Sequence, residues 1–306
     1  ALFVALAESG VFVSKDQGAN WNTANAGLPA QAFVDCLAAS DKDVFLGTFK
    51  DGIFVSENSG GWWKASNAGL PQQTAIKDIV TNGTSILAAT AAGVFLSTDR
   101  GASWNPMNQG LPTDLPASEL VALGPGLFAA MNGAVDGTVF LSSDSGEAWV
   151  PVGGSLPGKA RILCLTGLGS SVWVGTENHK VFRHAVESPE WEAGGSGLPG
   201  TKIYCLLANG EDLFAGTGGA IIIRIGDNAK DRLSFAGHGT GIFYSGNRGR
   251  RWKAINSGLR RAPDVPELGK MYGFWVLELA VCGDFLFAGT YDGEIWRLPL
   301  SELPKK

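Results

Sequence analysis

The chain has 306 residues, including 43 glycines, 16 phenylalanines and 10 tryptophans, and 17% of its residues are charged, with a formal net charge of −5. This apolar, aromatic composition excludes an intrinsically disordered chain, and because no run reaches about 18 consecutive apolar residues, it also excludes a membrane-spanning helix. Glycine supplies tight turns and aromatic side chains suit pleated surfaces, so the composition indicates an all-β fold.

Taken in chain order, the first predicted strand, residues 2–5, matches the second strand of later repeats, so the chain opens without a first strand. Residues 31–71 form the first complete unit. Its strands are expected at residues 33–38, 43–48, 52–56 and 63–65. The second-strand pattern returns at residues 86–90, 127–130, 172–176, 213–217 and 286–290, and the chain closes on a third strand at residues 294–297.

Counting residues 2–5 and 44–48, the second strand has seven copies. Repetition of one short-strand unit predicts a seven-bladed β-propeller of four-stranded antiparallel blades, forming a single domain over residues 1–306. Radial repetition leaves only short, protected sheet edges, and it lets incomplete chain ends meet in one region. Six blades with leftover strands is the alternative.

A turn signature, Ser-x-Asp-x-Gly-x-x-Trp, joins the third and fourth strands of most repeats. Its copies are Ser14-Asp16-Gly18-Trp21, Ser56-Asn58-Gly60-Trp63, Ser97-Asp99-Gly101-Trp104, Ser142-Asp144-Gly146-Trp149 and Ser245-Asn247-Gly249-Trp252, and a decayed copy runs from His184 to Trp191. Ser and Asp side chains hydrogen-bond backbone groups in tight turns, glycine accepts unusual backbone conformations, and tryptophan fills the space between sheets. Asp16, Asp99 and Asp144 are therefore expected to be structural, and no residue is predicted to be catalytic.

This signature resembles the Asp-box, or BNR, repeat of the sialidase-like superfamily, and the resemblance covers nearly the whole chain. Similar repeats occur in sialidases, xyloglucan- and cellulose-cleaving enzymes, sortilin-type receptors and photosystem II assembly-factor propellers. The resemblance implies a propeller but no single activity. A sialidase would need an Arg-Ile-Pro segment before the first box, whereas the first arginine here is Arg100, and neither Arg161-Ile162 nor Arg224-Ile225 is followed by proline.

Cysteines occur only in predicted first strands, at Cys36, Cys164, Cys205 and Cys282. Their spacing matches no metal-binding pattern, so they are interpreted as small buried side chains. One position of the first strand reads Cys36, Asp78, Glu119, Cys164, Cys205 and Glu278 in successive repeats. If this position faces the central channel, its carboxylates form a solvated wall or hold a cation or ordered water. No metal site or cofactor is predicted.

Two long connections, residues 218–239 and 258–273, are expected to rise from one rim of the sixth and seventh blades. Loops on a rigid scaffold frequently carry function, and extra loop length costs little entropy. The predicted ligand-binding residues, including those of neighbouring turns, are Glu177, Arg224, Asp227, His238, Arg260, Arg261, Tyr291 and Asp292. The alternative is a decorative hairpin, with residues 220–225 pairing with residues 233–236.

The sequence therefore predicts a non-catalytic binding or scaffold propeller that recognises a glycan or protein partner through this rim. It is expected to be monomeric, to bind neither nucleic acid nor membrane, and to be extracellular or periplasmic. The alternative is a glycoside hydrolase, which needs two carboxylates about 5–10 Å apart. Asp227 or Asp231 paired with Asp292 or Glu177 would be its candidates. Trp62, next to the motif Trp63, is expected to be partly exposed.

Overall fold

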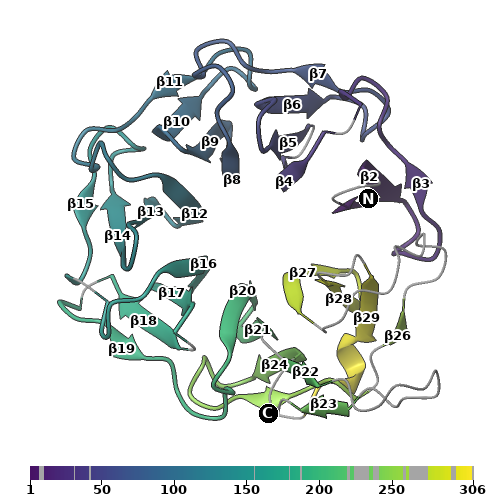
Figure 1. The fold of residues 1–306 in the computed structure, drawn as a ribbon, viewed down its shortest axis with the longest axis vertical. Coiled ribbons are helices and arrows are strands. Elements are labelled where there is room, and N and C mark those ends of the chain that lie inside the picture. The colour runs from purple at the N-terminus through teal and green to yellow at the C-terminus, as the bar shows by residue number, and fades with distance from the viewer. Residues whose placement is uncertain are drawn as a thin grey trace.

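The structure, a computed structural model, describes the chain except residues 7–9, 31, 41–42, 155, 179, 187, 219–220, 224–233, 237–240, 258–259, 262–274, 291–293 and 305–306. Seven antiparallel sheets are arranged in a ring around a central channel (Figure 1). The predicted seven-bladed β-propeller is confirmed, and the six-bladed alternative is wrong. Among the described residues, no helix is long and apolar enough to cross a membrane.

Within a blade, the first strand lies next to the channel and the fourth lies at the circumference (Figure 1). The first blade has three strands, β1 (Leu2–Leu6), β2 (Gly10–Ser14) and β3 (Asn22–Thr23). The second has β4 (Val34–Ala39), β5 (Val44–Thr48), β6 (Ile53–Ser56) and β7 (Lys64–Ala65). The third has β8 (Ile76–Asn82), β9 (Ser85–Thr90), β10 (Gly93–Ser97) and β11 (Asn105–Pro106).

The fourth blade has β12 (Ala117–Leu123), β13 (Gly126–Asn132), β14 (Gly137–Ser142) and β15 (Val150–Pro151). The fifth has β16 (Ile162–Leu168), β17 (Ser171–Thr176), β18 (Val181–Ala185) and β19 (Glu192–Ala193). The sixth has β20 (Lys202–Asn209), β21 (Asp212–Gly218), β24 (Gly241–Ser245) and β25 (Lys253–Ala254). Between β21 and β24, β22 (Ile221–Ile223) and β23 (Ser234–Ala236) pair as a hairpin, which confirms the extra strands considered from the sequence.

The seventh blade closes in a way that the sequence analysis did not predict. It contains β27 (Val276–Cys282), β28 (Phe285–Thr290) and β29 (Ile295–Pro299), followed by a single 3-10 turn (Leu300–Glu302). Its outermost strand is β26 (Arg260–Arg261), which precedes the other three in the chain and pairs with β29. The segment expected to be a rim loop therefore includes a short strand, and this strand covers an edge of β29 that would otherwise be unpaired.

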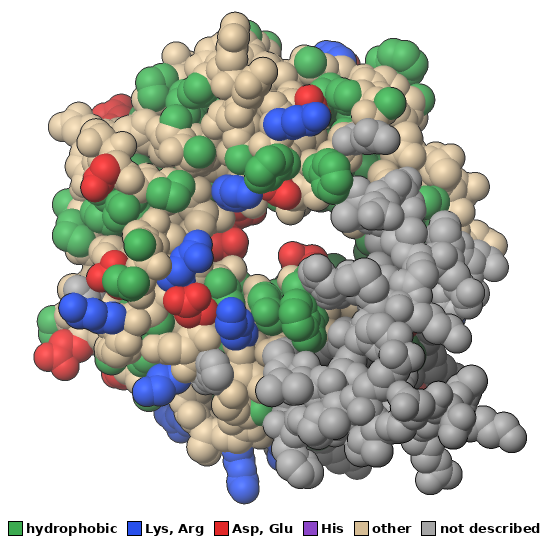
Figure 2. All heavy atoms as spheres, in the orientation of Figure 1, with side chains coloured by type: hydrophobic (Ala, Val, Ile, Leu, Met, Phe, Trp, Pro, Cys, Tyr) green, Lys and Arg blue, Asp and Glu red, His purple; other side chains and the backbone are tan. Residues whose placement is uncertain are grey.

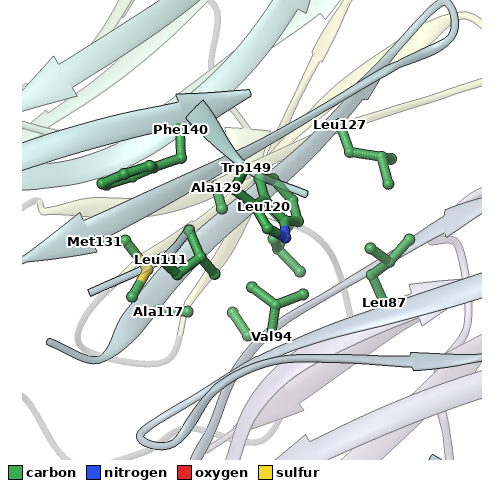
Figure 3. Close-up of a cluster of buried hydrophobic side chains, with 11 residues drawn as sticks. Leu87, Val94, Leu111, Ala117, Leu120, Leu127, Ala129, Met131, Phe140 and Trp149 are labelled. Atoms are coloured by element: carbon green, nitrogen blue, oxygen red, sulfur yellow. The ribbon is translucent and has the colours of Figure 1, made fainter. Parts of the chain in front are cut away.

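The core consists of apolar clusters between neighbouring blades. Figure 3 shows one of them, in which Leu87 and Val94 of the third blade face Leu120, Phe140 and Trp149 of the fourth. The motif tryptophans link neighbouring blades by a hydrogen bond that recurs from blade to blade. In each case the indole Nε1–H of one blade donates to a backbone oxygen of the preceding blade. Trp63 bonds Ala24, Trp104 bonds Ser66, Trp149 bonds Met107 and Trp252 bonds Gly194, at 2.7, 2.8, 2.8 and 2.8 Å.

The motif turns have the hydrogen bonds expected of structural residues. In the third blade, Ser97 Oγ donates to Asp99 Oδ1 at 2.7 Å and accepts the N–H of Gly101 at 2.8 Å. Asp99 also accepts the N–H and the hydroxyl of Ser103 at 2.9 and 2.6 Å. These bonds hold the pKa of Asp99 down at about 2, the hydroxyl bond having the largest effect. The turn hydrogen bonds expected of the motif acids are present at Asp16, Asp99 and Asp144.

Candidate binding surface at the channel mouth

Most of the sequence-predicted rim residues lie outside the described residues, namely Arg224, Asp227, His238, Tyr291 and Asp292. The same holds for Asp231, a hydrolase candidate. Glu177 is described, half-buried in the turn after β17, where its N–H donates to the carbonyl of Arg161 at 3.1 Å. The backbone of Arg260 and Arg261 lies in β26, at the outer edge of the seventh blade. The rim cluster therefore stays a prediction.

We call one position of the first strand the ring position; in successive blades it is occupied by Cys36, Asp78, Glu119, Cys164, Cys205 and Glu278. Side chains at this position link the first strands of adjacent blades. At this position a cysteine directs its thiol to a carbonyl of the next first strand. Cys164 Sγ lies 3.7 Å from the oxygen of Ile203, and Cys36 and Cys205 make the equivalent contacts at 3.9 and 3.7 Å. All four cysteines are free thiols, and the expected burial holds for Cys164 and Cys205, whereas Cys36 and Cys282 are half-buried.

The acids at the ring position accept a hydrogen bond instead. Asp78 Oδ2 accepts the N–H of Leu120, in the first strand of the next blade, at 2.8 Å, and Glu119 accepts the N–H of Leu165 in the blade after that. Both carboxyls are therefore bound to a neighbouring strand. The side chain of Glu278 is exposed, and one of its oxygens accepts the N–H of Leu279 in its own strand at 3.3 Å.

Loss of surrounding water raises the pKa of all three acids. Asp78 and Glu119 are half-buried, and although the side chain of Glu278 is exposed to the channel, protein atoms of the channel wall replace much of the water around its carboxyl group. The pKa of Asp78 rises to about 6 and that of Glu278 to about 7, while the pKa of Glu119 lies well above its usual value, with the charges of Asp78 and Glu278 adding to the effect of burial. Acidic side chains are visible around the central opening in Figure 2. Within the described part of the chain, no three His, Cys, Asp or Glu side chains form a group that could hold a metal ion.

Exposed aromatic side chains gather where the first strand of the second blade begins. Phe33 and Phe49 have exposed fractions of 50% and 57%, and the N–H of Phe49 donates to the carbonyl of Phe33 at 2.9 Å. Lys77 of the third blade places its Nζ 5.2 Å from the ring centroid of Phe49 and 2.9 Å from Asp35 Oδ2. Such a cation near an aromatic face contributes a weak attraction that strengthens when solvent is excluded.

A second aromatic pair lies at the start of the first strands of the sixth and seventh blades. The rings of Tyr204 and Trp275 stack with their centroids 6.0 Å apart and an interplanar angle of 16°. Leu277, two residues further along, has an exposed fraction of 38%. First and second strands are antiparallel, so the start of each first strand and the end of each second strand lie on one face of the propeller.

We call the surface formed by Phe33, Phe49, Lys77, Tyr204 and Trp275 the channel mouth. In Figure 2, hydrophobic and basic side chains lie beside the part of the central opening that is not drawn in grey. The sequence analysis missed these residues. Phe49 carried a usable signal, because it lies just outside a predicted strand, where a large aromatic side chain has no sheet face to cover. Phe33 was expected to open the first strand, whereas β4 begins one residue later, at Val34. Trp62, at 60% exposed, lies in the turn between β6 and β7 on the opposite face, and its predicted exposure is confirmed.

Comparison with known proteins identifies the fold of this chain but does not assign the chain to a family. No family profile matches the chain, and no curated protein matches it. Among solved structures, it is similar to the GH74 xyloglucanase from Xanthomonas campestris, with a TM-score of 0.70 and 15% identity over 99% of this chain and 51% of that one. This chain thus spans about half the length of the xyloglucanase chain.

Two further structures are similar. The extracellular domain of BT4673 from B. thetaiotaomicron has a TM-score of 0.64 and 14% identity over 94% of this chain and 36% of that chain. The WD40 repeats of RRP9 have a TM-score of 0.65 and 15% identity over 97% of this chain and 90% of that chain. At such identities the likeness shows a shared propeller fold, and a propeller serves many unrelated activities.

Proposed function

We propose that this propeller is a non-catalytic binding or scaffold module, and that its channel mouth recognises a protein partner. The observation that carries the proposal is the exposed group of Phe33, Phe49 and Lys77. Large aromatic side chains are enriched at the centre of protein interfaces, and Lys77 adds a cation beside the ring of Phe49. The similarity to WD40 repeats is in keeping with a scaffold role, because that protein shares the fold over most of both chains.

The energetic gain from covering this group is substantial. Full burial of a phenylalanine side chain is worth about 1.5–3 kcal/mol, so covering two half-exposed rings contributes on the order of 2 kcal/mol. Excluding water from Lys77 and Phe49 adds about 0.5–1 kcal/mol or more. The pair of Tyr204 and Trp275 lies on the same face, so a partner seated over the opening would contact both groups. In this proposal the rim residues of the sixth and seventh blades extend the same surface.

A glycan is the second candidate ligand, since the flat stack of Tyr204 and Trp275 suits the apolar face of a sugar ring. The repeated turns support assigning them to the Asp-box class, with Asn58 and Asn247 making the same bonds as the aspartates. An extracellular or periplasmic location remains our proposal, supported by the likeness to an extracellular domain, and we also propose that the protein is a monomer.

Glycoside hydrolysis is less well supported. The channel acids Asp78 and Glu119 accept backbone N–H bonds from the next blade, and these bonds account for their positions without a substrate. The likeness to a xyloglucanase rests on 15% identity.

The experiment is a comparison of three forms of the protein. Wild-type protein, a Phe49→Ala Lys77→Ala double variant and a Trp62→Ala variant are used for affinity enrichment with quantitative proteomics and, in parallel, for a glycan array. A partner kept by wild type and by Trp62→Ala, but lost by the double variant, supports the proposal. A glycan bound by wild type and by Trp62→Ala, but lost by the double variant, would indicate that the ligand is a sugar and not a protein partner. No ligand in either assay, or a ligand bound equally by the double variant, would overturn recognition at the channel mouth.

A further inference from the structure

The turn between the third and fourth strands of the sixth blade has a charge unlike that of the other motif turns. It joins β24 to β25 at the circumference of the propeller (Figure 1), on the face opposite the channel mouth. Its eight residues, Ser245 to Trp252, contain three arginines and no acid, a formal charge of +3. The equivalent eight residues carry no net charge in the first and third blades, −1 in the second and −2 in the fourth. We call residues 245–252 the arginine turn.

An asparagine at the acid position of the motif contributes to this charge. In the first, third and fourth blades that position is an aspartate, and its turn hydrogen bonds keep the carboxyl ionised, with the pKa of Asp99 at about 2. Asn247 makes the same contacts without a charge, because its Oδ1 accepts the hydroxyl of Ser245 and the N–H of Arg251, both at 2.9 Å. The turn geometry is thus kept while its central anion is absent.

Hydrogen bonds fix the backbone that carries the arginines. Within the turn, the N–H of Gly249 donates to Ser245 Oγ at 2.9 Å. The connection from the fifth blade runs alongside the turn, where the N–H of Ser196 donates to the carbonyl of Arg250 at 3.3 Å and the carbonyl of Ser196 accepts the N–H of Trp252 at 2.9 Å. The arginine side chains therefore start from ordered positions, which lowers the entropy that ligand binding must remove.

Two of the three arginines have no acidic partner among the described residues. Arg248 forms an ion pair with Glu211, in the turn between β20 and β21. Arg250 and Arg251 are exposed, and neither belongs to any ion pair of the described residues. Lys253, in β25, is likewise exposed and pairs with no described acid. Three uncompensated cations thus lie within four consecutive residues at the edge of the propeller.

The chemistry of these cations favours a ligand that carries several anionic groups. A guanidinium group can donate two parallel N–H bonds to a sulfate, phosphate or carboxylate, and such charge-assisted bonds are stronger than neutral ones. A short run rich in Arg and Lys is typical of patches that bind heparin or nucleic acid. Nucleic acid fits less well, because single strands stack their bases on aromatic side chains, and the aromatic residue of this run, Trp252, is only 3% exposed.

A protein partner also fits this surface less well. The centre of a protein interface is apolar and rich in aromatic side chains. Several large hydrophobic side chains are exposed in the described part of the chain, but none of them belongs to the sixth blade: Phe33, Phe49, Trp62, Val135, Val150, Val186 and Leu277. A ligand at the arginine turn must therefore be held by charge and hydrogen bonds, which a sulfated polysaccharide can provide along its whole length.

We propose that the arginine turn binds a sulfated polysaccharide. Arg250 and Arg251 contact its sulfate groups, and Lys253 extends the contact along β25. The absence of a carboxylate at Asn247 leaves these cations free to act on the ligand. This site lies on the face opposite the channel mouth and does not depend on the function proposed there. Because neutralised sulfate groups release their counterions, affinity should fall as the salt concentration rises.

The probe is a fluorescently labelled heparin dodecasaccharide, and its binding to the intact protein is followed by fluorescence anisotropy. Arg250→Ala combined with Arg251→Ala should weaken binding at least about tenfold and make the slope of log affinity against log salt less steep by about two. Asn247→Asp keeps the turn hydrogen bonds but adds the anion of the other blades, so it should weaken binding at least about threefold. Asn58→Asp is its matched control, in a turn without arginine, and should bind like wild type.

Further controls separate a site from a general effect of charge. Lys15→Ala combined with Lys50→Ala removes two exposed cations elsewhere and should leave binding within about twofold of wild type. An unsulfated oligosaccharide of the same length should not bind. Failure of the heparin probe to bind, or unchanged binding by the double arginine variant or by Asn247→Asp, would overturn the proposal. So would equal weakening by the lysine control, or tighter binding of a single-stranded oligonucleotide or of polyglutamate at the same turn. The urea midpoint of each variant shows that its fold is intact.

Discussion

Two glycines at equivalent positions should respond oppositely to the same substitution. Gly216 and Gly289 are both ring-position partners in second strands, and neither requires a left-handed backbone. At Gly216, an added Cβ would lie 2.3 Å from Cys205 Sγ and 2.7 Å from Val276 Cγ1. Both neighbours are buried, with exposed fractions of 5% and 0%, so neither can move into solvent.

These distances determine how much each substitution should change the free energy of unfolding. Forcing a methyl group into the closed site at Gly216 should cost about 1–3 kcal/mol of unfolding free energy, the usual range for overpacking. At Gly289 the methyl group meets no atom of the described residues closer than 4.0 Å. Gly289→Ala should therefore stabilise the protein by about 0.4–1 kcal/mol, because alanine restricts the unfolded chain more than glycine does.

Urea unfolding followed by tryptophan fluorescence provides the measurement, with the two variants compared at equal slope of the transition. Cys205→Ala combined with Gly216→Ala should recover part of the loss, because it removes the closest contact. If Gly289→Ala costs as much as Gly216→Ala, a side chain already occupies the space above Gly289. That result would refute the steric argument.

Three other predictions concern hydrogen bonds and protonation. The pKa of Asp99, about 2, lies below its unfolded value, so the stability that Asp99 contributes is present above pH 4 and is lost as the pH falls toward 2. Asn occupies the same motif position in two other repeats, at Asn58 and Asn247. Asp99→Asn should therefore make the free energy of unfolding less dependent on pH between 4 and 2. The pKa of Asp78, about 6, lies above its unfolded value, so stability falls as the pH rises from about 4 to 6. Asp78→Asn should therefore be more stable than wild type at pH 8, by on the order of 1 kcal/mol, and equal to it below pH 4, and an equal offset at both pH values would contradict this. Trp104→Phe removes the 2.8 Å bond to Ser66 and should cost about 1–3 kcal/mol in thermal or urea unfolding, whereas Trp62→Phe should stay within about 0.5 kcal/mol.

The sequence could predict the features that recur in every repeat. Strand order, blade number and the turn hydrogen bonds follow from periodic positions, and the missing first strand was already evident because residues 2–5 align with second strands. Features made by segments outside the repeat could not be predicted in this way. The pairing of Arg260 and Arg261 with Arg297 and Trp296 joins two irregular stretches of the chain, and neither stretch carries a pattern that specifies the other.

The channel also shows why repeat positions should be interpreted in pairs between blades. The alternation of cysteine and acid at the ring position looks irregular from one repeat to the next, and from the sequence it was interpreted as a solvated wall or a place for a cation or ordered water. In space it follows the neighbouring residues: cysteine occurs over Gly47, Gly175 and Gly216, and acid occurs over the alanines. Glu278 is the exception, because it is an acid paired with Gly289. An added Cβ at Gly289 would meet only the Cβ of Glu278 among the described residues, at 4.0 Å. The exception therefore lies where the first blade places no described side chain above the second-strand glycine, in contrast to Gly47 and Gly216, which are closed over by Ile76 and Val276 of the next blade.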